Sequence, residues 1–220
     1  MIDYTLKNYD KLFTAVLEHL QIVGITLVIS VLCSFVLLLI VNRVRWLGRL
    51  LYGTLLLTYC IPSIALFALL IPVFGLGKDN VIFGMVLYNL LLLLRNMNAA
   101  QNAIPLEIKD AAAGLGLDSI QIMKMVYIPI MLPYFIAGLR VATVSTTGIA
   151  TMASLVNAGG LGTILFEGMR MNHMPKLIWG IILVAGLALI LNYIFAKLEN
   201  RAVSWSSGGK ITGKEKISMS

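Results

Sequence analysis

The side chains that could take part in catalysis are few and scattered along this 220-residue sequence. No apolar segment holds paired carboxylates, a group of histidines, or a nucleophile beside a base, which are the arrangements that enzymes use. The best fragment of a nucleotide-binding loop is Gly209-Lys210, but Ile211 follows where such a loop has Ser or Thr. We therefore expect no catalytic residue and no bound cofactor in this chain.

Metal ligands are equally sparse. Cys33 and Cys60 stand alone inside apolar segments, so the sequence supports neither a disulfide framework nor a paired-cysteine metal motif. Residues 168–175 place three methionines around His173, and such soft ligands could bind copper. Single thioethers around one imidazole are weak evidence, and packing against a neighbouring subunit explains them better. We expect no metal site.

The remaining candidates are phenol, hydroxyl and amide groups inside otherwise apolar segments, namely Tyr59, Ser63, Asn89, Thr143 and Thr147. Such groups can line the path of a polar solute, or they can form hydrogen bonds between neighbouring helices. Small residues recur at four-residue spacing around the two threonines, which also favours close helix packing. Both interpretations stay open, and we treat the five residues as candidates for a translocation path.

The composition indicates where these residues lie. The chain is 59% hydrophobic and only 12% charged, about half the charged content that is usual in a soluble domain. A fold of this size cannot bury so much apolar surface, so lipid must cover part of it. The net charge of +7 resides mostly in short segments between apolar runs, and no basic patch accompanies an aromatic platform for bases. The sequence predicts an all-α polytopic membrane protein that does not bind nucleic acid.

Five segments can cross a bilayer as helices. They are residues 20–41, 50–74, 78–95 with a polar continuation from Arg95, 134–156 and 177–196. Pro62 and Pro72 predict a kink or a break in the second span, because proline removes a helix hydrogen bond. Arg140 lies near the start of the fourth span, where we expect its side chain to reach the lipid headgroups rather than to act as a gate.

An odd number of spans places the two termini on opposite sides of the membrane. With the N-terminus outside, most of the lysines and arginines fall in cytosolic segments, as the positive-inside rule requires. We therefore predict a multi-pass protein of the cell membrane with its C-terminus in the cytoplasm. Residues 1–200 form the transmembrane domain, with a cytosolic loop at about 102–133. Residues 201–220, rich in Ser, Gly and Lys, form a flexible cytosolic tail.

The cytosolic loop predicts a helical hairpin. Alanines at 111–113 favour a short helix without bulky side chains, and Gly116 offers a place for a turn. Asp118, followed three residues later by Gln121, is typical of a capping box that opens a second helix. We expect that helix to end at Pro129 and Pro133. A hairpin of this shape suits docking of a partner, and an amphipathic helix lying on the membrane surface is the alternative.

The spacing within the hairpin resembles the EAA loop of ABC importer permeases. That pattern is Glu-Ala-Ala, three residues, Gly, nine residues, Ile, one residue and Leu-Pro. The matching residues here are Asp110, Ala111, Ala112, Gly116, Val126, Ile128 and Pro129. The departures are conservative, and the shorter acid at Asp110 changes the reach toward a partner. The resemblance implies a type I ABC importer permease fold, with these residues coupling the chain to an ATPase.

Three further segments resemble permeases for osmoprotectants such as glycine betaine, carnitine and choline. They are residues 61–77, 137–140 and 157–162, and the resemblance as a whole covers about 20–198. Methionine-type permeases share the hairpin, the five spans and a similar Gly-Gly-Leu-Gly stretch. Uptake of methionine or another small zwitterion is therefore the alternative to uptake of an osmoprotectant.

The resemblance also implies the partners of this chain. A second copy or a related permease would pair with it in the membrane, and two ABC ATPase subunits, which bind ATP and Mg, would dock on the hairpins. An extracytoplasmic substrate-binding protein would deliver the solute, and membrane lipid would surround the spans. The chain itself would be a transport subunit and no enzyme. A passive channel or an ion-coupled transporter, with the hairpin resting on the membrane, is the alternative from a different class.

Overall fold

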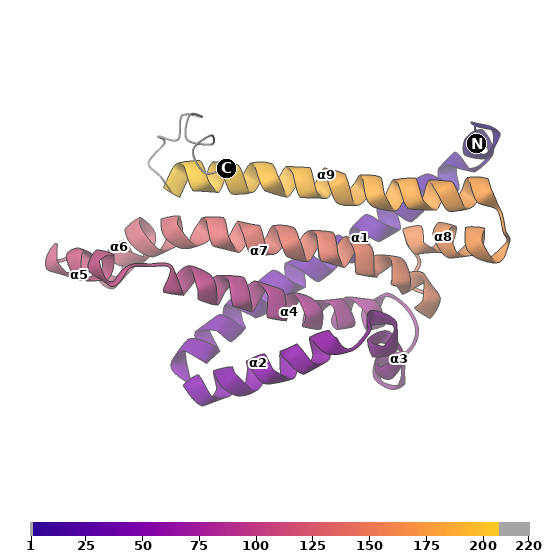
Figure 1. Ribbon diagram of the computed structural model, residues 1–220. Coiled ribbons are helices and arrows are strands. Elements are labelled where there is room, and N and C mark those ends of the chain that lie inside the picture. Colours follow the sequence, from indigo (N-terminus) through magenta and orange to yellow (C-terminus); the bar gives the residue numbers. More distant parts are fainter. Residues whose placement is uncertain (1, 207–220) are drawn as a thin grey trace, which may run out of the picture.

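A computed structural model describes residues 2–206, which are helical almost throughout and contain no strand (Figure 1). The α-helices are α1 (Ile2–Arg43), α2 (Arg45–Cys60), α3 (Ser63–Phe74), α4 (Lys78–Asn102), α5 (Leu106–Gly114), α6 (Ser119–Ile122), α7 (Ile128–Ile149), α8 (Leu161–Arg170) and α9 (Met174–Ser206). A π-helix (Met123–Tyr127) joins α6 to α7, and a 3-10 helix (Ala150–Val156) continues α7. The predicted all-α class is confirmed.

The structure contains four or five candidate spans, in agreement with the predicted number of about five. Within residues 2–206, four helical stretches are long and apolar enough to cross a membrane, and a fifth is reached when α2 and α3, bent by 110°, are counted as one broken span. The bend falls at Pro62, whereas Pro72 lies inside α3 without breaking it. The Tyr88 hydroxyl donates to the carbonyl oxygen of Ile61 at 2.6 Å, which pairs a backbone group that the bend leaves free.

The prediction that Pro129 and Pro133 end the second hairpin helix is wrong. The chain stays helical from Ser119 through both prolines to Val156. Pro129 lies in the first turn of α7, where no backbone donor is needed. The π-helix changes the hydrogen-bond register immediately before it, since the Ile128 N–H donates to the Met123 carbonyl oxygen. The second helix of the hairpin and the fourth span therefore form one continuous element.

Arg140 has two partners on α9 that the sequence analysis did not predict. Its Nε donates to Oδ1 of Asn192 at 2.7 Å, and its Nη1 lies 3.1 Å from Oε2 of Glu199. Both partners lie on α9, so the guanidinium cross-links α7 to α9, because a charge within a span gains most from pairing. Helix α9 also continues to Ser206 and includes the first part of the predicted tail. Residues 207–220 lie outside the described residues.

Helix α4 lies at the centre of the bundle. In its most apolar window 67% of the residues are buried, against 6% in the corresponding windows of the fourth span and of α9. These two outer helices therefore turn apolar side chains outward, as a protein surrounded by lipid or by a second subunit requires. Ala142, Thr146 and Ala150 of the fourth span are nevertheless fully buried. The close-packing interpretation of this small-residue row is consistent with that burial.

The bundle has two distinct ends, joined by α7. Figure 1 shows α5 and α6 projecting at one end, which we call the hairpin end, and α8 lying at the other, which we call the α8 end. The start of α1 lies at the α8 end, and the last turns of α9 lie at the hairpin end. The described termini therefore lie at opposite ends of the bundle.

Candidate functional site

The hairpin turn is held by local hydrogen bonds, as the sequence predicts. Gly116 adopts a φ of +70°, and the Leu117 N–H donates to the Ala112 carbonyl oxygen at 3.3 Å, which ends α5 in a Schellman motif. Oδ1 of Asp118 accepts from the N–H groups of Ile120 and Gln121, each at 2.8 Å. The Gln121 side chain accepts from the Asp118 N–H at 2.9 Å and completes the capping box.

The predicted coupling residues lie along this hairpin. Asp110, Ala111 and Gly116 are exposed, Ala112 is buried, and Val126 and Pro129 are half-buried. The acidic side chain, the small residues and the turn are thus brought together on one projecting element. Val126 lies in the π-helix and Pro129 at the start of α7, so these two connect the hairpin to the membrane span.

Three large apolar side chains on the projecting hairpin are exposed. Leu115 is 78% exposed, Met125 67% and Ile120 65%. A group of exposed apolar side chains on a projecting element is typical of a protein or membrane contact surface. We call these three residues the hairpin apolar surface.

An apolar cavity of about 620 Å³ lies behind the hairpin, between the end of α1, the end of α4 and the start of α7. Phe35 and Phe135 lie in its wall with their ring centroids 5.3 Å apart, and Met123 and Tyr127 of the π-helix also line it. The π-helix therefore borders open space on its inner side.

The candidate path residues fall into two groups. Asn89, Thr143 and Thr147 are buried. The Asn89 amide exchanges hydrogen bonds of 2.9 and 3.0 Å with the Thr146 hydroxyl, which ties α4 to α7. The Thr147 hydroxyl donates to the Thr143 carbonyl oxygen at 2.8 Å within α7. The Thr143 hydroxyl donates to the Leu139 carbonyl oxygen at 2.7 Å. Each of these three side chains thus has a partner inside the chain, and its place in a path stays a prediction.

The second group lies at the bend between α2 and α3. Tyr59 is 41% exposed, and its ring meets that of Tyr88 edge-on at a centroid distance of 5.6 Å. Ser63 is half-buried and is the first residue of α3. The structure therefore places an accessible aromatic ring and a hydroxyl on either side of Pro62, apart from the buried threonines of α7.

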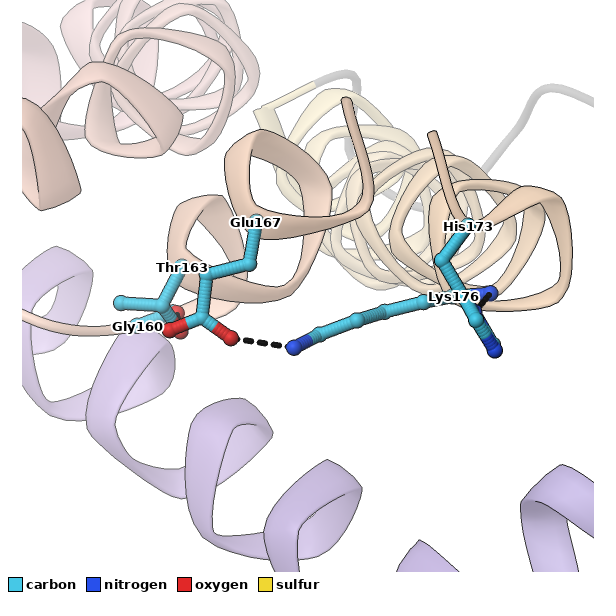
Figure 2. Close-up of polar contacts among 5 residues, drawn as sticks. All are labelled: Gly160, Thr163, Glu167, His173 and Lys176. Carbon is cyan, nitrogen blue, oxygen red and sulfur yellow. Dashed lines mark hydrogen bonds and ion pairs between the residues drawn. The ribbon is translucent and has the colours of Figure 1, made fainter. Parts of the chain in front are cut away.

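The α8 end contains a polar cavity of about 590 Å³ between α1, α8 and α9. Figure 2 shows Glu167 of α8 and Lys176 of α9 pointing toward one another across it, where they form an ion pair. The hydrogen bond from Lys176 lowers the pKa of Glu167. The Thr163 hydroxyl donates to the Gly160 carbonyl oxygen at 2.7 Å and stabilises the first turn of α8.

Two neighbouring residues of α1 bind the start of α8, and the sequence analysis did not select them. Oε2 of Glu18 accepts from the Gly160 N–H at 2.9 Å. Nδ1 of His19 accepts from the Leu161 N–H at 3.3 Å, and its Nε2 lies 3.1 Å from the Thr147 carbonyl oxygen. The available signal was an ionisable pair at the edge of a long apolar run, which is a functional hypothesis by default in a membrane helix.

Comparisons with known proteins agree with this architecture. Residues 26–204 match the family described as the binding-protein-dependent transport system inner membrane component. The osmoprotectant import permease protein OsmW of Salmonella typhimurium is 32% identical over 203 residues, covering 90% of this chain and 94% of that protein. The glycine betaine/carnitine/choline transport system permease protein OpuCB of Bacillus subtilis is 28% identical over 201 residues, covering 91% and 93%.

A solved structure shares the fold. The inward-facing MetNI methionine ABC transporter has a chain that superposes with a TM-score of 0.75 at 20% identity, covering 87% of this chain and 95% of that one. The family match extends from the first span through the hairpin to the last turn of α9. The chain therefore belongs to the family of binding-protein-dependent transport system inner membrane components, the permease subunits of ABC importers.

Proposed function

We propose that this chain forms the membrane path by which an ABC importer takes up a quaternary ammonium osmoprotectant, and that a separate ATPase drives it from the hairpin end. The observation that carries the proposal is the hairpin itself. Its turn is fixed by Gly116 and Asp118, and its apolar surface lies in the open. Similarity to osmoprotectant permeases over nearly the whole chain supports the choice of solute.

The coupling follows from the continuity of the fourth span. An ATPase that closes on ATP and Mg would displace the hairpin apolar surface, with the exposed Asp110 carboxylate available to a basic group of the ATPase. The helix from Ser119 to Val156 has no break, so it would carry that displacement across the bundle to the α8 end. ATP binding and solute release are then linked by one coupling free energy.

The orientation is part of the proposal. The hairpin end would face the cytosol, where the ATPase subunits are, and the α8 end would face outward, where a binding protein delivers the solute. A second permease, identical or related, would cover apolar faces of the outer helices and complete the path between the two subunits. This arrangement agrees with the distribution of lysine and arginine along the chain.

The solute class follows from shared chemistry. Choline, glycine betaine and carnitine all carry a trimethylammonium group, which aromatic faces attract without a counter-charge. Tyr59 offers such a ring at the bend between α2 and α3, beside Ser63. One exposed ring binds a cation weakly, by about 0.5–1 kcal/mol. Weak binding suits a path that must release its solute.

The test is uptake into proteoliposomes that hold this permease with its ATPase and binding protein. We expect ATP-dependent uptake of at least one of glycine betaine, choline and carnitine, and none with a catalytically inactive ATPase. Uptake that persists with the inactive ATPase would instead support a channel or an ion-coupled transporter. ATP-driven uptake of methionine alone would retain the importer and overturn the solute class.

A further inference from the structure

The contact between α1 and the start of α8 joins three helices through two adjacent side chains. We call Glu18, His19, Thr147, Gly160 and Leu161 the α8 contact. Its hydrogen bonds link residues 128 and 142 positions apart, so no local sequence preference produces them. His19 is fully buried, and Glu18 is half-buried at the wall of the polar cavity.

The geometry fixes the hydrogen-bonding role of each imidazole nitrogen. Nδ1 faces the Leu161 N–H and must accept, whereas Nε2 faces the Thr147 carbonyl oxygen and must donate. The neutral imidazole with its proton on Nε2 satisfies both bonds at once. His19 therefore bridges the α7 backbone and the α8 backbone, and an apolar side chain in its place would remove the acceptor of the buried Leu161 N–H, the first N–H of α8.

Gly159 and Gly160 allow the backbone before α8 to lie close to Glu18 and His19. Both have φ near +80°, at 83° and 82°. A Cβ at Gly159 would lie 2.5 Å from Oε2 of Glu18, and one at Gly160 would lie 3.2 Å from Nδ1 of His19. The positive φ strains any residue with a Cβ at either position, and an added Cβ would also press on the Glu18 or His19 side chain of α1. The Glu18 carboxylate also lies at the N-terminus of α8, where the helix dipole favours negative charge.

The α8 contact lies at the far end of the element that starts in the hairpin. From Ser119 the fourth span continues to Thr147, whose carbonyl oxygen accepts from His19, and His19 in turn holds the first N–H of α8. Figure 1 shows α7 extending from the hairpin end to α8. We propose that Glu18 and His19 are positioning residues that make α1, α7 and α8 move as one body, so that hairpin displacement reaches the α8 end.

This inference rests on the proposed function, and two measurements separate them. The first is hydrogen exchange in the purified permease, which needs no ATPase. In His19→Ala we expect the amides at 160–161 to exchange at least tenfold faster, while those of the hairpin stay unchanged. Unchanged exchange at 160–161 would overturn the α8 contact as a restraint on α8.

The second measurement is the number of solute molecules taken up per ATP hydrolysed by the reconstituted complex. We expect His19→Ala to lower this ratio at least tenfold with ATP hydrolysis retained, because the hairpin still docks but α8 no longer follows. His19→Gln offers one acceptor and one donor, and we expect it to restore most of the ratio. A variant that merely lost stability would lower uptake and ATP hydrolysis together.

Glu18 provides a second pair of variants in case His19→Ala fails to assemble. Glu18→Ala removes the acceptor for Gly160 at a half-buried position, whereas Glu18→Gln keeps a carbonyl oxygen there. We expect Glu18→Ala to lower the transport ratio severalfold and Glu18→Gln to leave it near that of the unmodified protein. Ratios equal to the unmodified value in both His19→Ala and Glu18→Ala would overturn the proposal. A complex without any ATP-driven uptake would overturn the proposed function instead.

Discussion

The hairpin end and the α8 end of this bundle are stabilised in opposite ways. At the hairpin end the turn depends on hydrogen bonds between residues two to five positions apart, such as those of Asp118 and Gly116's neighbours. At the α8 end the decisive bonds connect α1 to residues 128 and 142 positions away. The hairpin turn is thus locally encoded, whereas the start of α8 depends on contacts with the rest of the bundle.

The same contrast holds for their surfaces. The hairpin exposes Leu115, Ile120 and Met125 and borders an apolar cavity. The α8 end buries His19 and borders a polar cavity lined by charged side chains such as Glu167 and Lys176. One end thus exposes apolar side chains, and the other holds its own backbone with buried polar contacts. Substitutions at the two ends should therefore fail in different ways.

The largest effect should follow from Gly162→Ala at the α8 end. A Cβ there would lie 1.9 Å from the Thr151 carbonyl oxygen and 2.7 Å from Oγ of Ser154, so the backbone of α8 must move. We expect the free energy of unfolding to fall by about 3 kcal/mol, which is the upper range for forced overpacking. Thermal unfolding of the purified permease measures it. Gly186→Ala in α9, where nothing lies within 4 Å, is the control, and equal melting temperatures for the two variants would contradict this.

The next largest effect should come from Gly116→Val at the hairpin end. No atom lies within 4 Å of a Cβ built on Gly116, so the substitution causes no clash. The cost is the backbone strain of a residue with a Cβ at a φ of +70°, about 1–2 kcal/mol. Because the docking-competent turn becomes a minor state, ATPase binding and uptake should fall about tenfold while membrane insertion stays unchanged.

Gly114→Val is the matched control for this prediction, since Gly114 also has free space and its φ is not positive. It should keep ATPase binding near that of the unmodified permease. Binding lost equally in both variants would mean that side-chain bulk, rather than the turn, matters on this surface.

The hairpin shows which features the sequence could predict and which it could not. The turn at Gly116 and the cap at Asp118 were predictable because their partners are close in sequence and their chemistry is specific. The path through Pro129 was not, because the π-helix that accommodates it depends on hydrogen-bond register rather than on residue type.

The α8 contact escaped prediction for a different reason. Glu18 and His19 read as residues at the edge of a membrane span, and Gly159 and Gly160 read as a turn. No signal in either segment predicts that the two segments are in contact, because the contact forms only when α1 packs against α7 and α8. The number of spans followed from composition, whereas this contact followed from tertiary packing alone.

A smaller effect should follow from Asp118→Ala, which removes the capping box of the hairpin. Loss of an N-cap costs about 1 kcal/mol, so the second hairpin helix should fray and ATPase affinity should fall severalfold, less than in Gly116→Val. Affinity is measured by titrating the ATPase onto the reconstituted permease. Asp118→Asn keeps a capping oxygen and should bind normally, so an equal loss in both variants would assign the effect to the charge rather than to the cap.

The smallest effect should come from the ion pair between Glu167 and Lys176 at the α8 end. The hydrogen bond from Lys176 lowers the pKa of Glu167 below its ordinary value of 4.5, so the charged carboxylate stabilises the folded protein. This contribution to the stability of the folded protein is fully present above pH 4.5 and is lost as the pH falls through the lowered pKa. Because Glu167 is 43% exposed, it amounts to well under about 1 kcal/mol.

Thermal unfolding of the permease and of Glu167→Gln between pH 7 and pH 3 tests this sign. The unmodified protein should be slightly more stable at pH 7, and the difference should shrink toward acid and in high salt. A difference that grows toward acid would contradict the direction of the shift. A difference of several kcal/mol at pH 7 would place the stability of the α8 end in this surface pair and not in the buried contact of His19, which salt should leave nearly unchanged.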